Sequence, residues 1–463
     1  MNSDTNTIAA VATGEGGAIS VLRISGPDAL TICDRVFRNP KGKKLADAKG
    51  YTLLYGTLLD GENTIDEVLV SVFRAPHSYT GENMAEIGCH GSPYIRQAVL
   101  DLLTRHGVRP AGAGEFTLRA FLNGKLDLSQ AEAVADLIAA DNRGAHALAV
   151  HQMRGGYSEE FRKLRDQLLE LLSLLELELD FGEEDVEFAD RLKLAEIIER
   201  TTARIDALRK SFALGNVIKN GVPVTIAGAP NVGKSTLLNA LLREDRAMVS
   251  DVAGTTRDVI EGVLNIRGIR FRFIDTAGIR KTEDRLEAMG IERTFQRIGS
   301  ASVVLLLVES EMPDEAVSEQ IRQLGIRPGQ HLAVVLNKTD RTSPDFAKKR
   351  IEELKALTEV PVLAISAREN RNLDRLTDYL FQTVGEQTGE KGDIVVSNAR
   401  HVEALDRAGE ALKRAREGLA SGLSGDLLAE EVREAVHHLG LVTGEISTED
   451  VLGSIFSRFC IGK

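Results

Sequence analysis

A phosphate-binding loop is the feature that most constrains this chain. Residues 228–235 are Gly-Ala-Pro-Asn-Val-Gly-Lys-Ser and fit the pattern Gly-x-x-x-x-Gly-Lys-Ser/Thr. The apolar run 222–227 before the loop predicts a buried strand, and the run 236–242 after it predicts a helix. Backbone N–H groups at the start of such a helix surround a phosphate. We therefore expect Lys234 to reach the β- and γ-phosphates of a nucleotide and Ser235 to bind Mg²⁺.

A second motif predicts which base the nucleotide carries. Residues 337–340 are Asn-Lys-Thr-Asp and follow the apolar run 332–336, which predicts a strand. The aspartate of such a motif accepts hydrogen bonds from the ring N1–H and amino group of guanine, and the lysine stem covers the base. Adenine offers the wrong donor pattern, so the motif predicts GTP. Ser366 and Ala367 follow the predicted strand 361–365 and are expected to add backbone contacts to the guanine O6.

A third motif predicts the magnesium site. Residues 275–278 are Asp-Thr-Ala-Gly and follow the predicted strand 271–274, so that a carboxylate faces Mg²⁺ or its water ligands. Thr256, in the oxygen-rich loop 250–258, is a second candidate ligand for Mg²⁺. Four motifs in order, each at the end of a predicted strand, indicate a Ras-like P-loop GTPase domain. The predicted GTP-binding residues are Asn231, Val232, Gly233, Lys234, Ser235, Thr236, Ser250, Asp251, Val252, Ala253, Gly254, Thr255, Thr256, Asp275, Thr276, Ala277, Gly278, Asn337, Lys338, Asp340, Ser366 and Ala367.

The residue after the Asp-x-x-Gly motif departs from the Ras-like pattern. It is Ile279, where Ras-like GTPases have a glutamine that orients the attacking water. Isoleucine cannot orient water, so either the domain hydrolyses GTP poorly or another group acts. Asn231 favours the second alternative, because its side-chain oxygen could hold K⁺ together with backbone carbonyls of the loop 250–256. The cation would then supply the charge of an arginine finger. Alternatively, Asn231 is a plain turn residue.

Composition limits the class of protein. A chain of 463 residues with 43% hydrophobic content is expected to form two to four domains with packed cores. The net charge of −12 argues against a broadly basic nucleic-acid binder, although a basic partner could bring in RNA. The three cysteines are widely spaced and predict neither a zinc site nor a disulfide framework. We found no signal core and no long apolar run, so we expect a cytoplasmic protein without membrane association.

The pattern along the chain predicts a multidomain α/β protein. We expect an α+β domain at 1–122, the first half of a helical domain at 123–216, an inserted G domain at 217–385 and the second helical half at 386–463. The supporting β-like runs are 18–24, 51–58 and 67–73, and the supporting helical runs are 161–179, 195–208, 402–419, 427–439 and 449–459.

Several stretches outside the G domain carry a resemblance to a known family. They are the Gly-rich segment 16–26, Ser-Tyr-Thr-Gly-Glu at 78–82, the run 114–128 and the terminal Phe-Cys-Ile-Gly-Lys at 459–463. Each stretch alone fits a turn, a helix cap or a frayed tail. Together with the inserted G domain they closely resemble the family of tRNA-modification GTPases called MnmE or TrmE, over nearly the whole chain.

The resemblance implies a folate site in the N-terminal domain. The ligand would be a reduced folate of the 5-formyl-tetrahydrofolate type that serves as a one-carbon source. Cations suit the folate glutamate carboxylates, and a carboxylate suits the amino and N–H donors of the pterin. The matching positions are Arg23, Glu86, Lys125 and Lys463.

The resemblance also implies a mechanism for the G domain. K⁺ would be held by Asn231, Ser250, Val252 and Thr255. Glu287 would act as the general base or position the water, although most glutamates of this kind lie on solvated helix faces. The G domains of a homodimer would pair across the nucleotide.

A partner protein and an RNA substrate follow from the same resemblance. With a flavin-dependent partner, MnmG, the family adds an aminomethyl or carboxymethylaminomethyl group at C5 of the wobble uridine of certain tRNAs. The thiol of Cys460, three residues from the end of the sequence, is the candidate nucleophile for that chemistry. Two alternatives stay open: a GTPase switch in ribosome assembly, and a folate-dependent one-carbon enzyme with a regulatory G domain.

Overall fold

The computed structural model describes residues 6–180, 191–248, 262–267, 269–274, 301–385, 394–457 and 459–462. The chain forms two compact units. The first comprises Met1–Ala139, Ala149–Ala203 and Ala404–Lys463, and the second comprises Ala140–Leu148 and Arg204–Glu403. None of the described helices combines the length and apolar character that a membrane span needs. The domain boundaries predicted from the sequence stay predictions.

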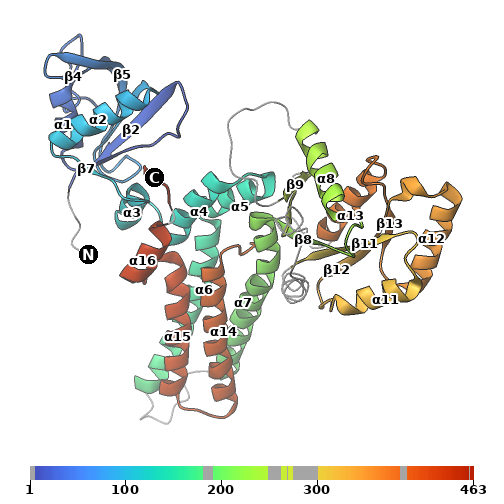
Figure 1. Cartoon of the computed structure of the whole chain (residues 1–463). Coiled ribbons are helices and arrows are strands. Elements are labelled where there is room, and N and C mark those ends of the chain that lie inside the picture. Colours follow the sequence, from blue (N-terminus) through green and yellow to red (C-terminus); the bar gives the residue numbers. More distant parts are fainter. Residues whose placement is uncertain are drawn as a thin grey trace. The chain divides into compact units, whose positions relative to one another are not determined.

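A seven-stranded sheet occupies the N-terminal part of the first unit (Figure 1). Its order is β3-β4-β5-β6-β2-β1-β7, and every pairing is antiparallel except the parallel pair β1 and β7. The three β-like runs predicted from the sequence lie almost entirely in β2, β4 and β5. The strands are β1 (Ile8–Val11), β2 (Ile19–Ser25), β3 (Phe37–Arg38), β4 (Thr52–Asp60), β5 (Asn63–Phe73), β6 (Met84–His90) and β7 (Arg109–Pro110).

The two faces of this sheet differ because side chains alternate along each strand. Helices α1 (Ala29–Val36) and α2 (Pro93–Arg105) pack on one face, where Leu22, Val70 and Ile87 belong to the buried core. On the opposite face, Ile8 and Ala10 of β1 pack with Phe116, whereas β4 and β5 carry exposed side chains. This second face holds the N-terminal candidate site described below.

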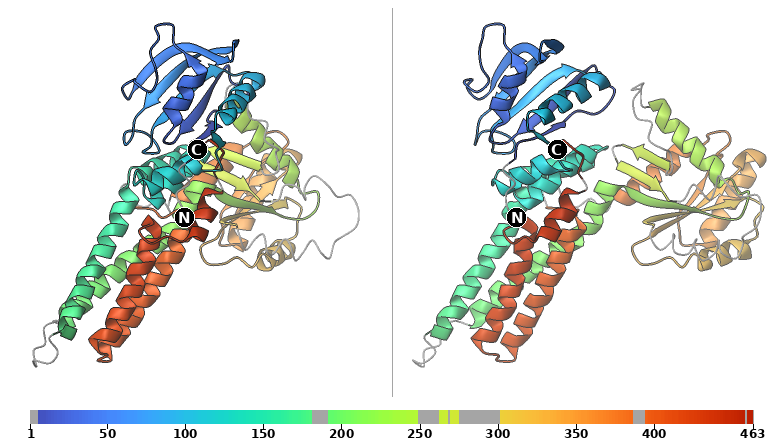
Figure 2. Two further views of the ribbon diagram at one scale, coloured as in Figure 1. Left: turned by 90° about the vertical axis from the view of Figure 1, so that its left-hand side faces the viewer. Right: turned by 60° about the vertical axis from the view of Figure 1, so that its left-hand side comes forward.

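Long helices form most of the rest of the first unit. Figures 1 and 2 show α6, α7, α14 and α15 lying side by side. On α6, Leu164, Leu168, Leu171 and Leu175 are buried at the three- and four-residue spacing of one helix face. The helices are α3 (Glu115–Leu122), α4 (Leu128–Ala139), α5 (Arg143–Met153), α6 (Gly156–Asp180), α7 (Arg191–Asn220), α14 (Ala399–Ala420), α15 (Gly425–Thr443) and α16 (Glu449–Phe456). Of these, residues 143–148 of α5, 204–220 of α7 and 399–403 of α14 belong to the second unit.

The second unit contains a six-stranded sheet in the order β13-β12-β11-β8-β10-β9. Strand β9 pairs antiparallel with β10, and the other pairings are parallel. The predicted strand before the phosphate-binding loop coincides with β8. The strands are β8 (Val222–Ala227), β9 (Gly262–Ile266), β10 (Ile269–Phe273), β11 (Val303–Glu309), β12 (His331–Asn337) and β13 (Val362–Ala364).

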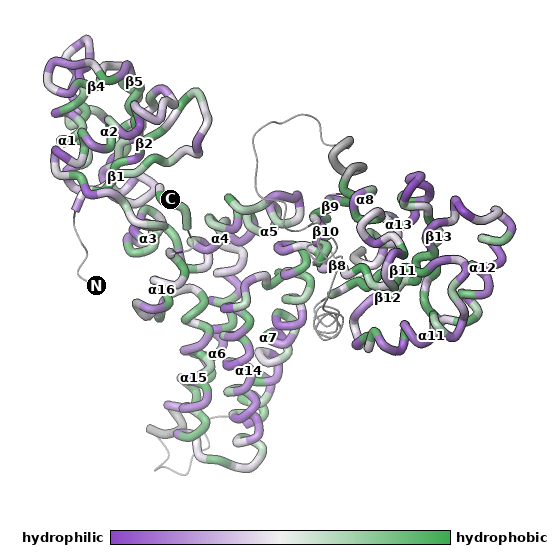
Figure 3. The backbone as a smooth tube through the Cα atoms, in the orientation of Figure 1, coloured by the Kyte–Doolittle hydropathy of each residue, from purple (hydrophilic) through white to green (hydrophobic). Residues whose placement is uncertain are grey.

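Helices cover both faces of this sheet. Helices α8 (Lys234–Met248) and α13 (Leu373–Gly385) contribute to the core on one face, and α11 (Asp314–Gln323) and α12 (Pro344–Leu357) to the core on the other. The central strands β11 and β12 are therefore apolar except at their ends, and Figure 3 shows hydrophobic colour along both. The strand order reverses between β8 and β11, and in such sheets ligands bind at the carboxyl ends of the strands beside this point. The predicted fold class, with its Ras-like domain, is confirmed.

Candidate functional site

The phosphate-binding loop joins β8 to α8 at the reversal of strand order. Two of its glycines need the backbone freedom that only glycine has. Gly228 and Gly233 have φ angles of +139° and +103°. A Cβ at Gly228 would lie 2.4 Å from the carbonyl oxygen of Leu307, and one at Gly233 would lie 2.4 Å from Nδ2 of Asn337. The loop is therefore packed tightly against the ends of β11 and β12.

The side chain of Lys234 contacts the backbone at the start of the phosphate-binding loop. Its Nζ donates to the carbonyl oxygens of Gly228, at 2.7 Å, and Ala229, at 2.8 Å. Burial lowers the pKa of this lysine. An ammonium group held in this way can exchange carbonyl oxygens for phosphate oxygens without leaving the loop.

Asn337 connects the guanine motif to the loop and to β13. Its Nδ2 donates to the carbonyl oxygen of Val232 at 2.9 Å, and its Oδ1 accepts from the backbone N–H of Ala367 at 3.1 Å. The residue is only 2% exposed. Ser366 donates through Oγ to Oδ1 of Asp340 at 2.6 Å, and this hydrogen bond lowers the pKa of the aspartate. The carboxylate predicted to accept from guanine is thus kept ionised.

Lys338 contacts the same loop one residue before the contact of Asn337. It adopts a left-handed conformation with a φ of 60°, and its Nζ donates to the carbonyl oxygen of Asn231 at 2.8 Å and pairs with the carboxylate of Glu309. In a trans peptide the carbonyl and the following N–H point in opposite directions. Lys338 and Asn337 therefore turn the N–H groups of Val232 and Gly233 toward the side on which such loops bind phosphate.

The structure brings together the predicted GTP-binding residues that it describes, from the loop, β12 and the end of β13. Thr236 lies in the first turn of α8. Asn231 has a left-handed φ of 63°, which asparagine tolerates better than most residues. The remaining predictions for this site lie outside the described residues: Ser250, Asp251, Val252, Ala253, Gly254, Thr255, Thr256, Asp275, Thr276, Ala277, Gly278, Ile279 and Glu287.

A second candidate site lies on the face of the N-terminal sheet that is opposite α1 and α2. Arg23 and Glu86, both predicted as folate ligands, are direct cross-strand neighbours on β2 and β6. The arginine donates to Oε1 of Glu86 from Nη2 at 2.7 Å and from Nε at 2.9 Å. Its guanidinium also lies over the rings of Tyr79 and Phe116, at 5.2 and 5.7 Å from the centroids. The pair thus forms a charged and aromatic cluster.

Lys125 lies beside the loop that carries Tyr79. Its Nζ donates to the carbonyl oxygen of Pro76 at 3.1 Å. Asn123 donates from Nδ2 to the carbonyl oxygen of Thr80 at 2.7 Å, and a Cβ at Gly81 would lie 3.3 Å from Cγ of Lys125. The two predicted ligands Arg23 and Lys125 therefore approach the loop 78–82 from different elements.

The C-terminal tail contacts the same domain. Ile461 forms a β-bridge with Ala113, and the N–H of Gly114 donates to the carbonyl oxygen of Cys460 at 3.5 Å. Gly462 is buried with a φ of +98°, and a Cβ there would lie 2.3 Å from the carbonyl oxygen of Val11. Cys460 is exposed, and Lys463 lies outside the described residues.

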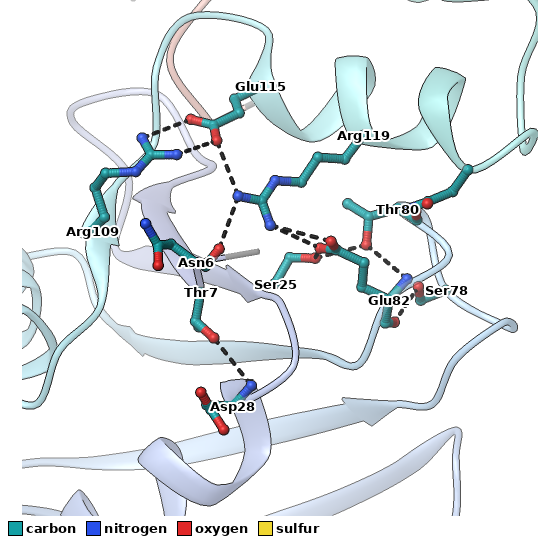
Figure 4. A network of polar contacts seen from close by, with 11 residues as sticks. Asn6, Thr7, Ser25, Asp28, Ser78, Thr80, Glu82, Arg109, Glu115 and Arg119 are labelled. Carbon is teal, nitrogen blue, oxygen red and sulfur yellow. Dashed lines mark hydrogen bonds and ion pairs between the residues drawn. The ribbon is translucent and has the colours of Figure 1, made fainter. Parts of the chain in front are cut away.

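A buried polar network was missed by sequence reasoning. Figure 4 shows Arg119 between the carboxylates of Glu82 and Glu115, with Ser25, Thr80 and Arg109 completing the contacts. The residues from 78 to 82 and from 114 onward were singled out in the sequence as unusual stretches. Their pairing could not be predicted because it joins segments that are far apart in the chain.

These contacts define the class of protein. A phosphate-binding loop preset by an Asn-Lys-x-Asp motif, on a doubly wound sheet, is the nucleotide site of a P-loop GTPase. Family models agree with the whole arrangement. The model described as the MnmE helical domain matches residues 128–460, and the model described as the GTP-binding protein TrmE N-terminus matches residues 7–125. The chain belongs to the MnmE family of tRNA modification GTPases.

Full-length relatives support the same assignment. The tRNA modification GTPase MnmE of Christiangramia forsetii is 51% identical over 472 residues, covering 99% of each chain. The protein of the same name from Bacteroides thetaiotaomicron is 51% identical over 475 residues, covering 100% of each chain. Among solved structures, the G domain of the T. maritima FeoB iron transporter matches at 26% identity, covering 35% of this chain and 98% of its own, with a TM-score of 0.26.

Proposed function

We propose that this chain is a K⁺-activated GTPase that works with the flavoprotein MnmG on tRNA in the cytoplasm. The pair adds an aminomethyl or carboxymethylaminomethyl group at C5 of the wobble uridine, with a one-carbon unit from a reduced folate. The observation that carries the proposal is that one chain combines a preset guanine-nucleotide loop with a charged cluster beside its own cysteine-bearing tail.

The N-terminal cluster suits a reduced folate chemically. Arg23, Lys125 and Lys463 are cations for the glutamate carboxylates of the ligand, and Glu86 is an acceptor for the donors of the pterin. The described contacts of Glu86 with Arg23 use Oε1, which leaves a second carboxylate oxygen to accept from a ligand. The half-buried ring of Tyr79 adds flat apolar surface next to these charges, and the buried ring of Phe116 supports the guanidinium of Arg23.

Magnesium and potassium belong to the proposal for the G domain. Ser235 and Thr256 would bind Mg²⁺, and Asn231 would hold K⁺ with Ser250, Val252 and Thr255. K⁺ would supply positive charge where the transition state gains negative charge. An arginine finger in that role accelerates turnover by roughly 10³–10⁵, so GTP turnover in KCl should exceed that in NaCl by orders of magnitude at equal ionic strength. Equal rates in the two salts would exclude the cation mechanism.

Glu287 would orient the attacking water in place of the missing glutamine. A Glu287→Ala variant should bind GTP normally and lose about 10²-fold or more in turnover. A variant that keeps its GTP turnover and its K⁺ activation would show that Glu287 is only a glutamate on a solvated helix face.

The modification itself has a direct test. Mass spectrometry of tRNA nucleosides from a strain that lacks the gene should show loss of the wobble-uridine modification. Complementation with Cys460→Ser should fail to restore it, while the purified variant keeps GTP hydrolysis and folate binding, because a thiolate is a far better nucleophile than a hydroxyl. An unchanged nucleoside profile in the deletion strain would favour the ribosome-assembly switch instead.

A homodimer is part of the proposal, and the exposed part of the N-terminal sheet supports it. Leu53, Tyr55 and Leu69 are 59%, 50% and 48% exposed. Tyr55 and Leu69 are cross-strand neighbours, so their side chains form one surface with the row that contains Arg23 and Glu86. Apolar patches bordered by polar groups are typical of protein interfaces. The acidic chain would reach tRNA through the basic surface expected of its partner MnmG.

A further inference from the structure

Arg119 is a buried cation that the proposed chemistry does not use. Its side chain is 8% exposed. Nη1 donates to both carboxylate oxygens of Glu82, at 3.2 and 3.1 Å. Nη2 donates to Oε1 of Glu115 at 3.1 Å and to the carbonyl oxygen of Asn6 at 2.9 Å. One guanidinium therefore joins α3, the loop after β5 and the segment before β1 (Figure 4).

The two carboxylates extend the network in opposite directions. Glu82 accepts from Oγ of Ser25 at 2.7 Å. The same Ser25 Oγ lies 2.7 Å from Oγ1 of Thr80. Glu115 accepts from the N–H of Gly112 at 2.8 Å and pairs with Arg109. Burial by itself raises the pKa of Glu115, but the hydrogen bonds from Arg109, Gly112 and Arg119 outweigh it and lower the pKa. Two arginines thus balance two buried or half-buried carboxylates, as charges removed from water require.

Each part of the network adjoins a residue of the folate site proposed above. Ser25 ends β2 two residues after Arg23, and Thr80 follows Tyr79, whose hydroxyl lies 2.8 Å from Oγ1 of Thr117 on α3. Glu115 precedes Phe116, the second ring over Arg23. A shift of Arg119 would therefore move both rings and the arginine between them.

The same network reaches the other elements of the site through the backbone. Gly112 is next to Ala113, which bridges to the C-terminal tail at Ile461. Thr80 accepts through its carbonyl oxygen from Asn123, two residues before Lys125. The network thus contacts the loop 78–82 and adjoins the segments that carry Arg23, Lys125 and the bridge to the C-terminal tail.

We propose that the Arg119–Glu82 pair is a positioning device for the folate site, holding the loop 78–82 and α3 so that Tyr79 and Arg23 face the ligand together, with the buried ring of Phe116 packed against Arg23. This inference rests on the proposed function. Arg119 touches no ligand itself in this scheme. Its effect is on the geometry, and hence on the affinity, of the groups in front of it.

The test compares Arg119→Met with Arg105→Met in the full-length protein. Arg105 forms an exposed ion pair with Asp60 in the same domain and is the matched control. Binding of 5-formyl-tetrahydrofolate is measured by calorimetry, with GTP turnover and thermal melting alongside. Arg119→Met should weaken folate binding by about 10- to 100-fold, because charge-assisted hydrogen bonds are lost, while GTP turnover stays within about twofold. The control should bind as wild type does.

Hydrogen exchange separates this inference from the folate proposal. Amides of residues 78–83 and 112–118 should exchange at least about tenfold faster in Arg119→Met than in wild type, with the six-stranded sheet unchanged. If wild type does not bind the folate, the folate proposal fails and this exchange measurement alone decides the positioning role. Unchanged exchange, or wild-type folate affinity in the variant, would overturn the inference.

A milder variant guards against a folding defect. Glu82→Gln keeps the size of the side chain and an oxygen that accepts from Ser25, but removes the charge that Arg119 contacts. It should melt within a few degrees of wild type and still weaken folate binding by about tenfold. If Arg119→Met does not fold, Glu82→Gln with wild-type affinity would equally overturn the proposal.

Discussion

Glu309 forms an ion pair with Lys338, which in turn contacts the phosphate-binding loop. It lies opposite Asn337 in the parallel pair of β11 and β12, and its carboxylate pairs with Lys338, which holds the carbonyl of Asn231. The Glu309 side chain is 37% exposed, so solvent screens this pair in part. The pair nevertheless restrains the lysine that is predicted to cover guanine.

We expect Glu309→Gln to weaken GDP binding by about three- to tenfold, since Lys338 loses its charged partner. Fluorescence titration with a labelled GDP measures the effect. Glu311→Gln changes an exposed glutamate two residues further on and should leave the affinity unchanged. Equal affinity in the two variants would show that the pair has no part in nucleotide binding.

The three cysteines should differ sharply in reactivity. Burial, with a smaller contribution from Asp34, raises the pKa of Cys33 to about 12, and burial, with Asp66, raises that of Cys89 to about 11. At pH 8 the Cys33 thiol is therefore ionised in only about one molecule in 10⁴. Cys460 is exposed.

We therefore expect Ellman's reagent to titrate one thiol rapidly in the native protein and three in denaturant. Raising the pH toward 11 should speed the reaction of the buried thiols. Cys460→Ser should remove the rapid phase. A rapid phase that persists in this variant would mean that a buried cysteine becomes accessible in solution.

At the scale of elements, the C-terminal tail depends on one glycine. Gly462 has a positive φ and lies against the backbone of Val11, so that any Cβ would collide with a carbonyl oxygen. Gly453, in α16, has open space around its Cα. A side chain at position 462 is therefore excluded, whereas position 453 has room for one.

Gly462→Ala should release the tail and lower wobble-uridine modification by at least about tenfold, with GTP turnover unchanged. Gly453→Ala should be neutral or stabilise the protein by about 0.5–1 kcal/mol, because alanine favours the helix. Nucleoside analysis of complemented strains and thermal melting measure the two effects. Full modification with Gly462→Ala would show that the modification does not depend on the position of the tail.

At the scale of the whole molecule, we propose the exposed patch of Leu53, Tyr55 and Leu69 on the N-terminal sheet as the homodimer surface. Replacing Leu53 and Tyr55 together by aspartate would place charge in this apolar patch, where burial of unpaired charge is costly. We expect wild type to sediment as the proposed dimer and the double variant to sediment as a monomer at the same concentration. Tyr94→Asp, at an exposed position on α2, is the control and should leave the dimer intact. A double variant that remains dimeric would place the interface elsewhere.

Much of this protein could be predicted from the sequence by itself. The phosphate-binding loop and the strand before it were predictable because their requirements are local: glycines for the turn, a lysine at the helix start and an apolar strand. Strand β8 was predicted to the residue, and the long helices were found from their apolar spacing. Helix ends were less accurate. The helix predicted over 449–459 ends at Phe456, because Phe459 turns back into the apolar cluster around Leu128.

Only the tertiary structure decided how these segments meet. The ion pair of Arg23 with Glu86 depends on the register of β2 and β6. A shift of one strand by a single residue would abolish the pair. Arg119 lies 37 residues from Glu82 in the chain and 113 from Asn6, and their contacts need three elements to pack at once. The pairing of Lys338 with Glu309 likewise depends on the order of strands in the sheet. Local patterns therefore determined the class of protein, whereas contacts between distant residues decided the geometry of its sites.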